Sequence, residues 1–166
     1  MNTSHFQQLV WNQYQKHART LPWRVPETDG TYNPYKIAVS EIMLQQTQVS
    51  RVIEKYNLFI ETFPTLESLA TAELSDVLHL WNGLGYNRRA KHLHDAAKQL
   101  AYKSFPRDVT ELTALKGIGK NTASAILVYA FDTPQVFVET NIRTVMIHHY
   151  FSKKSLVHDD ELVKKV

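Results

Sequence analysis

Apolar residues recur at helical spacing along almost the whole chain, and this pattern predicts an all-α fold with short connections. In the first segment, residues 6–16, one face carries Phe6, Leu9, Val10 and Tyr14. Asp108, with Glu111 three positions later, is expected to cap a short helix. The other segments with helical spacing are residues 35–45, 49–63, 65–70, 74–81, 88–102, 121–130 and 141–151.

Residues 35–45 carry apolar side chains almost all round the expected helix, which should therefore be largely buried. Pro34 suits the first turn of this helix, and Glu41 lies in its middle. Burial disfavours a charged carboxylate, so the pKa of Glu41 should rise, as a general acid near neutral pH requires. The alternative is that Glu41 lies on the one exposed stripe or pairs with an arginine.

Four polar side chains in a row follow this helix, namely Gln45, Gln46, Thr47 and Gln48. Amide and hydroxyl groups add little to an apolar core, but they suit hydrogen bonding to the edges of nucleic-acid bases. The run therefore favours base recognition, and an ordinary polar junction between two helices is the alternative.

Residues 115–123, with the sequence LKGIGKNTA, form the stretch around which the chain is organised. Gly117 and Gly119 permit positive φ and a close approach to another molecule. The next helix starts near Asn121, where free N–H groups and the positive dipole end favour an anion such as a DNA phosphate. Lys116 and Lys120 add positive charge. The alternative is a helical corner whose glycines serve packing alone.

The turn GLGY at residues 83–86 is expected to expose Leu84 and Tyr86 beside Arg88 and Arg89. An aromatic ring next to two arginines can enter a DNA base stack. The same ring can instead anchor the loop to the core, and the sequence leaves both roles open.

Glu139 precedes a helix that Thr140 is expected to cap and that runs from Asn141 to residue 151. The positive end of that helix favours a charged carboxylate, which is the opposite of the environment expected for Glu41. Two carboxyl groups whose pKa values are shifted in opposite directions suit a general acid paired with an electrostatic stabiliser. A simple glutamate at a helix start is the alternative.

Composition narrows the class of protein further. The 166 residues contain no cysteine and no run of 18 apolar residues, and the first 15 residues lack a signal-peptide core. We therefore expect a cytosolic protein, associated with the nucleoid if it is bacterial, with no disulfide and no thiolate metal site. The eight histidines form no convincing metal site, because adjacent or alternate histidines diverge on a helix.

Charge is uneven along the chain. Residues 1–87 carry 6 basic and 8 acidic side chains, whereas residues 88–154 carry 11 basic and 5 acidic ones. The basic excess surrounds the Gly117–Gly119 turn and indicates a polyanion-binding surface, with a solvated basic face as the alternative.

Taken together, residues 6–151 resemble the helix-hairpin-helix DNA glycosylases, and most closely their MutY-type adenine DNA glycosylase branch. The run at 40–49 and the Leu-Gly-Tyr turn are specific in combination, whereas the hairpin marks only the superfamily. The stretches that carry the resemblance are LPWR at 21–24, PYK at 34–36, SEIMLQQTQV at 40–49, LHLWNGLGY at 78–86, LKGIGKNTA at 115–123 and VETNIRTV at 138–145.

The resemblance implies two helical lobes with the active-site cleft between them, into which a base is flipped out of double-stranded DNA. One lobe would comprise residues 31–135, with the hairpin near 109–131, and the other residues 1–30 and 136–166. Glu41 matches the catalytic glutamate that protonates adenine at N7, and Asn141 matches an asparagine that helps to hold the catalytic groups. Gln46 and Thr47 match residues inserted near the mispair, and Tyr86 matches the wedge beside 8-oxoguanine.

Three features depart from the family. Glu139 replaces an aspartate that stabilises the positively charged sugar, and its extra methylene shifts the carboxylate by about 1 Å. Asn121 stands where bifunctional relatives have a lysine nucleophile and MutY-type members have Ser or Tyr, which implies a monofunctional enzyme. The family's four-cysteine 4Fe-4S cluster and its 8-oxoguanine-reading C-terminal domain are missing, so the chain is either a fragment or a reduced relative.

We therefore expect a monomeric glycosylase that removes adenine mispaired with guanine or 8-oxoguanine in double-stranded DNA, with no membrane association. Two alternatives stay open. One is a superfamily member that removes thymine or another mispaired pyrimidine, and the other is a DNA-binding module without catalysis.

Overall fold

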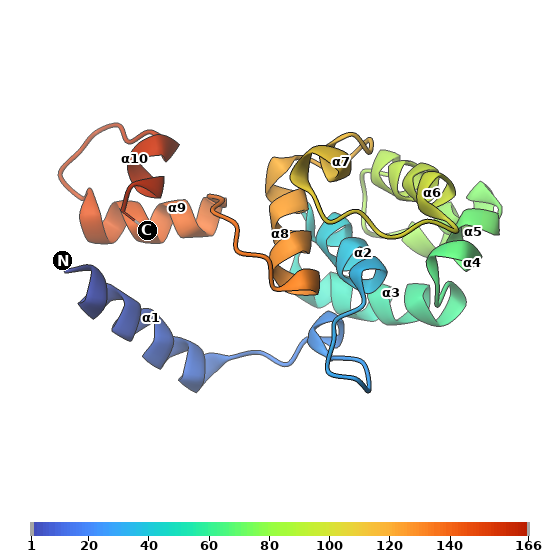
Figure 1. Ribbon diagram of the computed structural model, residues 1–166, viewed down its shortest axis with the longest axis horizontal. Coiled ribbons are helices and arrows are strands. Elements are labelled where there is room, and N and C mark those ends of the chain that lie inside the picture. The colour runs from blue at the N-terminus through green and yellow to red at the C-terminus, as the bar shows by residue number, and fades with distance from the viewer. Residues whose placement is uncertain (1, 166) are drawn as a thin grey trace. The chain divides into compact units, whose positions relative to one another are not determined.

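The computed structural model describes residues 2–165, which form ten α-helices, one short 3-10 helix and no strand (Figure 1). The all-α prediction is confirmed, and every helix expected from periodicity is present within a few residues of its expected bounds. The elements are α1 (Thr3–His17), η1 (Pro22–Arg24), α2 (Pro34–Leu44), α3 (Val49–Thr62), α4 (Leu66–Thr71), α5 (Leu74–Trp81), α6 (Arg88–Leu100), α7 (Val109–Thr113), α8 (Lys120–Phe131), α9 (Thr140–Tyr150) and α10 (Asp159–Val163).

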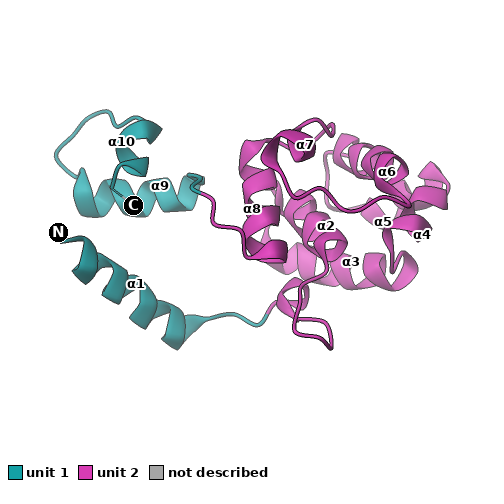
Figure 2. Cartoon of the chain, in the orientation of Figure 1, with its two compact units in different colours: residues 1–20, 136–166 teal, residues 21–135 magenta. Residues whose placement is uncertain are grey.

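The chain divides into two compact units (Figure 2). Unit 1 combines residues 1–20 with residues 136–166, and unit 2 comprises residues 21–135. Residues 21–30, which the sequence analysis grouped with the N-terminal helix, belong to unit 2 in this division. Within the described part of the chain, no helix has both the length and the hydropathy needed to cross a membrane.

Helix α2 lies at the centre of unit 2 and packs against α8, α3 and α6. Seven of its residues are buried, as expected for a helix that is apolar almost all round. Asn33 caps α2 by accepting hydrogen bonds from the backbone N–H groups of Tyr35 and Lys36 at 3.0 and 3.3 Å. The Tyr35 hydroxyl donates to the Phe63 carbonyl at 2.7 Å, which joins α2 to the end of α3.

The helix that leads into the hairpin has the predicted cap. Asp108 Oδ1 accepts from the backbone N–H groups of Thr110 and Glu111 at 2.7 and 3.3 Å. These bonds hold the pKa of Asp108 below its usual value, because they favour its charged form. Helix α7 therefore begins at Val109 and delivers the chain to the Gly117–Gly119 turn.

Unit 1 has a small core of its own, formed by Met146, Val157 and Leu162. Helix α1 buries none of its residues, and Phe6 packs edge-on against His149 and Tyr150, with ring centroids 5.3 and 5.2 Å apart. Helix α9 begins at Thr140 and its N-cap is Glu139. The prediction that Thr140 caps this helix is therefore wrong by one residue, because Thr140 already has helical geometry.

Candidate functional site

The two glycines of the hairpin turn have different environments. Gly117 has a φ of +89°, and a Cβ atom at this position would lie 2.8 Å from the Cβ of His92. Gly119 has a φ of −85°, so positive φ is confirmed for Gly117 and wrong for Gly119. Apart from Gly119 itself and its chain neighbours, no described atom lies within 4 Å of where a Gly119 Cβ would be. Backbone conformation and internal packing therefore explain glycine at 117 but not at 119.

Helix α8 starts at Lys120, one residue before the predicted start at Asn121, and Gly119 is its N-cap. Because glycine has no side chain, it makes no capping hydrogen bond to the first N–H groups of the helix. Lys116, Lys120 and Asn121 are all exposed beside this helix start. The turn thus combines an accessible positive helix end with two flanking cations, which suits an anion.

Gln45 joins the end of α2 to the hairpin. Its Nε2 donates to the carbonyl oxygen of Gly117 at 3.3 Å and to the hydroxyl of Thr122 at 3.1 Å. The next residue, Gln46, is exposed and has a φ of +56°. Thr47 is half-buried, and its hydroxyl lies 3.4 Å from the Leu84 carbonyl oxygen, to which it donates.

The turn at residues 83–86 separates its two large side chains. Leu84 is only 3% exposed, so the prediction that it is exposed is wrong. The backbone N–H of Leu84 donates to the Trp81 carbonyl at 3.1 Å, and Trp81 Nε1 donates to the Gly85 carbonyl at 3.2 Å. These bonds fold the turn back and direct Leu84 into the core. Tyr86 is 65% exposed and has a φ of +50°.

Sequence reasoning did not assign a role to Arg89. Its guanidinium donates to backbone oxygens at the end of α2 and in the 83–86 turn. Arg88, the arginine of this pair that we expect to bind DNA, is exposed at the start of α6. A pair of neighbouring arginines in a basic helix carries no signal that tells the half-buried one from the exposed one.

Glu41 lies on α2 with a side chain that is 12% exposed, and Nη2 of Arg24 is 3.6 Å from its Oε1. Pairing with an arginine was the alternative left open by the sequence. Burial disfavours the charged carboxylate and the guanidinium favours it, so the protonated state of Glu41 stays a prediction. The guanidinium of Arg24 also lies over the ring of Tyr129, with Cζ 3.2 Å from the ring centroid.

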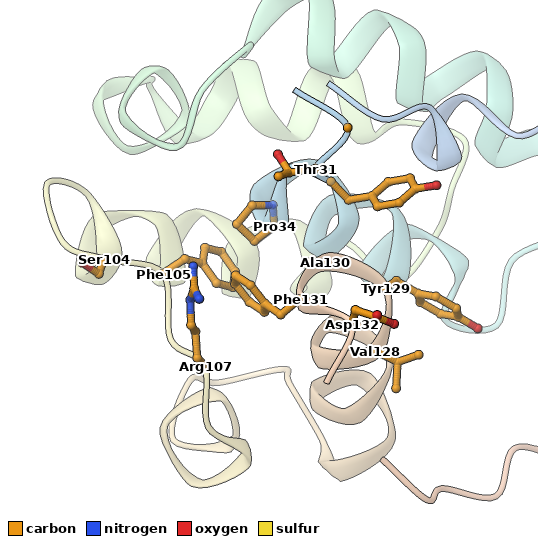
Figure 3. A pocket seen from close by; sticks show the side chains of 12 residues that line it. Thr31, Pro34, Ser104, Phe105, Arg107, Val128, Tyr129, Ala130, Phe131 and Asp132 are labelled. Atoms are coloured by element: carbon orange, nitrogen blue, oxygen red, sulfur yellow. The ribbon is translucent and has the colours of Figure 1, made fainter. Parts of the chain in front are cut away.

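Tyr129 also lines a cavity of about 960 Å³ in unit 2 (Figure 3). Figure 3 shows the side chains of Phe105, Arg107 and Phe131 side by side on one side of this cavity, and Cζ of Arg107 lies 4.7 Å from the Phe131 ring centroid. None of the site residues predicted from sequence lines this cavity. The contact between Tyr129 and Arg24 therefore links the cavity wall to Glu41.

The two remaining predicted catalytic residues belong to unit 1, whereas Glu41 belongs to unit 2. Glu139 is exposed at the start of α9 and makes no capping hydrogen bond through its side chain. Asn141 is exposed in the first turn of α9, where it lines an apolar groove of about 680 Å³ beside α1. The catalytic roles of both residues stay predictions.

The 4Fe-4S cluster implied by the resemblance does not fit these residues, because the chain contains no cysteine to ligate it. Among residues 2–165, no group of three or more His, Asp or Glu side chains is placed to hold a metal ion.

Comparison with known proteins shows a consistent likeness. A model of the family described as HhH-GPD superfamily base excision DNA repair protein matches residues 39–165. The chain is 43% identical to an adenine DNA glycosylase of Buchnera aphidicola subsp. Baizongia pistaciae over 154 residues, which cover 90% of this chain and 42% of that protein. It is 42% identical to the adenine DNA glycosylase of Mycolicibacterium smegmatis over 149 residues, which cover 88% of this chain and 49% of that protein. The chain thus spans less than half the length of these two relatives.

Solved structures share the fold. A thermostable thymine-DNA glycosylase superimposes with a TM-score of 0.82 at 26% identity, covering 99% of this chain and 78% of that one. Endonuclease III in a non-covalent complex with DNA superimposes with a TM-score of 0.76 at 18% identity, covering 100% of this chain and 78% of that one. At that low identity, the second likeness concerns the fold alone.

Proposed function

This chain belongs to the HhH-GPD superfamily of base excision DNA repair proteins, and we propose that it is the catalytic core of a monofunctional adenine DNA glycosylase. Its reaction would be hydrolysis of the N-glycosidic bond of adenine mispaired with guanine or 8-oxoguanine. Two adenine DNA glycosylases that are more than 40% identical to this chain support the choice of adenine.

The observation that carries the proposal is the position of Glu41. Its carboxyl group is mostly buried on α2, and its neighbour Arg24 lies 3.6 Å away. A general acid must be held at hydrogen-bonding distance from the atom that it protonates. We assign Glu41 the protonation of the adenine ring at N7, which makes the base a neutral leaving group.

DNA would dock on the hairpin turn. Gly119 has neither a positive φ nor a close internal neighbour, so its missing side chain leaves room for an external phosphate beside the N–H groups of α8. Lys116 and Lys120 would add charge-assisted contacts to the sugar–phosphate chain.

Gln46 and Tyr86 would disrupt the base stack. Both side chains are exposed, and both residues have a left-handed backbone in the connections between helices. Side chains inserted in this way make new contacts that offset the free-energy cost of unstacking, and they help to release the target base from the duplex. Thr47 and Gln45 would support this edge of the site through their contacts with the turn and the hairpin.

Glu139 would stabilise the positive charge that develops on the sugar as the bond to adenine breaks, with Asn141 holding the catalytic groups in place. A carboxylate aimed at the developing charge lowers the barrier without transferring a proton. Water then attacks the sugar, and no lysine nucleophile is needed.

The proposal is tested with a duplex labelled on the adenine strand, incubated with the protein and then treated with alkali. Base release leaves an abasic site that alkali cleaves, so a labelled short product is expected from A:8-oxoguanine and A:G duplexes. Glu41→Gln should abolish this product while largely sparing DNA binding. Glu61→Gln, which changes an exposed glutamate on α3, is the matched control and should leave the product unchanged.

Two observations favour other functions. The thermostable thymine-DNA glycosylase shares the fold at a TM-score of 0.82, so thymine mispairs belong in the same panel of substrates. Glu139 replaces the expected aspartate, which favours a DNA-binding module without catalysis. Salt-sensitive binding with no product from any mispair would support that module and contradict the glycosylase.

A further inference from the structure

The guanidinium of Arg89 closes the end of α2. Its Nη1 donates to the carbonyl oxygens of Ile42, Met43 and Gln45 at 2.8, 2.9 and 2.6 Å. The last carbonyl groups of a helix have no partner within the helix, and they carry its negative dipole end. A half-buried cation at this position satisfies these oxygens and caps the end of α2.

The same guanidinium also holds the turn at residues 83–86. Its Nη2 donates to the carbonyl oxygens of Leu84 and Gly85 at 3.1 and 3.0 Å and to the Thr47 hydroxyl at 3.1 Å. Each terminal nitrogen carries two hydrogens and meets three acceptors, so the hydrogens are shared. Arg89 thus connects two segments that lie about forty residues apart in the sequence.

These two segments carry two of the four non-glycine residues with positive φ in the described part of the chain, and both of these residues are exposed. Gln46 follows the tethered Gln45 carbonyl and has a φ of +56°, and Tyr86 follows the tethered Gly85 carbonyl and has a φ of +50°. Residues with a Cβ atom avoid the left-handed region, and they stay there only when their surroundings hold them. In each segment, the tethered oxygen belongs to the residue directly before the strained one.

We propose that Arg89 is a positioning residue that holds Gln46 and Tyr86 in the backbone geometry from which their side chains enter DNA. This role rests on the proposed function, because it assigns a purpose to both exposed side chains. Arg89 touches neither the target base nor the phosphates in this scheme; it acts through the two segments that it joins.

Lysine cannot replace arginine in this role. The guanidinium is planar and presents its donors as a rigid fork, whereas an ammonium group is a compact point with three donors. The rings of Trp81 and Tyr86 each lie with their centroids 5.5 Å from Cζ of Arg89 and add cation–π contacts on the flat group. Only the fork reaches both the α2 carbonyls and the turn.

The first test places 2-aminopurine, whose fluorescence rises on unstacking, at the target position of a mispaired duplex. Arg89→Lys should lose most of the fluorescence rise and slow single-turnover base release about 100-fold, as expected for a displacement of about 1 Å. Salt-sensitive binding should persist, because the hairpin is intact. The matched control is Arg51→Lys, an exposed arginine on α3, which should behave as the wild type does.

A rescue variant separates positioning from general destabilisation. Asparagine tolerates the left-handed region better than glutamine and keeps the side-chain amide. Arg89→Lys combined with Gln46→Asn should therefore recover part of the fluorescence rise, whereas a fold weakened in general would gain nothing. Thermal unfolding followed by circular dichroism gives the folded fraction of each variant.

Amide hydrogen exchange of the free protein tests the tether without any reaction. Arg89→Lys should lower protection in residues 45–47 and 84–86 while leaving α8 unchanged. Unchanged protection, or unchanged base flipping by Arg89→Lys, overturns the inference. If the wild-type protein flips 2-aminopurine but releases no base, the proposed glycosylase activity fails. The role of Arg89 in base flipping is then still tested by comparing the fluorescence rise of Arg89→Lys with that of the wild type.

Discussion

Nη2 of Arg24 lies 3.6 Å from Oε1 of Glu41, which joins the short η1 helix to the middle of α2. The guanidinium of Arg24 also lies over the ring of Tyr129 on α8, with Cζ 3.2 Å from the ring centroid. Three segments of unit 2 therefore meet at the guanidinium of Arg24, beside the carboxyl group proposed to protonate adenine. We expect the orientation of this carboxyl group to depend in part on the cation, which the sequence places 17 residues earlier.

Replacing Arg24 with glutamine should slow base release. Glutamine cannot stack on Tyr129 as a guanidinium does, so the carboxyl of Glu41 loses the neighbour that orients it. We expect a fall in the single-turnover rate of about 100-fold, with little change in DNA affinity. Arg19→Gln, at an exposed position in unit 1, is the control. An unchanged rate for Arg24→Gln would show that the ion pair does not orient the acid.

Alanine substitutions at the two hairpin glycines should separate folding from DNA binding. Gly117→Ala forces a Cβ into the left-handed region and against His92, so it should destabilise the protein by about 1–3 kcal/mol. Gly119→Ala meets no internal atom and has a permitted φ, so its cost should stay near that of a poor N-cap, about 1 kcal/mol or less.

The DNA affinities should show the reverse difference between these two variants. Gly119→Ala places a methyl group where the phosphate is proposed to lie, so it should weaken binding more than its effect on stability explains. Urea unfolding and fluorescence anisotropy at several salt concentrations measure the two quantities. Equal affinity of Gly119→Ala and wild type would count against phosphate docking at this turn.

Glu139→Asp should raise catalytic activity. The proposed stabilising carboxylate stands one methylene too far along its side chain, and a displacement of about 1 Å can cost about 100-fold in rate. We therefore expect a gain of up to about 100-fold in single-turnover base release, without a change in affinity for the mispaired duplex. Glu73→Asp, at an exposed position in unit 2, serves as the control. A gain in the rate of base release would also argue against the alternative that the protein is a DNA-binding module without catalysis.

Stability should fall in mild acid because of His94. This side chain is buried on α6, and its Nε2 lies 3.0 Å from the Ala72 carbonyl oxygen. Burial, together with the nearby Lys98, holds the pKa of His94 below its usual value. In the unfolded chain, His94 takes up a proton at about pH 6.5. The contribution of buried, neutral His94 to the free energy of unfolding is therefore complete above that pH and is lost as the pH falls toward the lower pKa of the folded state.

His94→Gln should reduce this pH dependence, because glutamine keeps a donor for the Ala72 carbonyl and does not titrate. Urea unfolding at about pH 7.5 and about pH 5 measures the difference in the free energy of unfolding. His79→Gln, which changes an exposed histidine on α5, should leave the pH dependence as in the wild type. An equal loss of stability in both variants would assign the effect to other groups.

Much of the fold follows from local rules that the sequence states directly. Apolar spacing predicts the helices, Pro34 marks the start of α2, and Asp108 marks the start of α7. The family, the hairpin turn and the exposed Tyr86 were also predicted from sequence. The helices and their starts depend on residues within a few positions of one another, where helical periodicity and capping decide the outcome.

The tertiary structure decided what distant residues do to each other. It buries Leu84, gives Gly119 an ordinary φ, pairs Glu41 with Arg24, and sets Arg89 between α2 and the 83–86 turn. None of these can be read from periodicity, and the contacts of Arg24 with Glu41 and of Arg89 with α2 join groups that lie far apart in the sequence. The sequence by itself determined the helices and the kinds of chemistry available, and packing determined which of those groups meet.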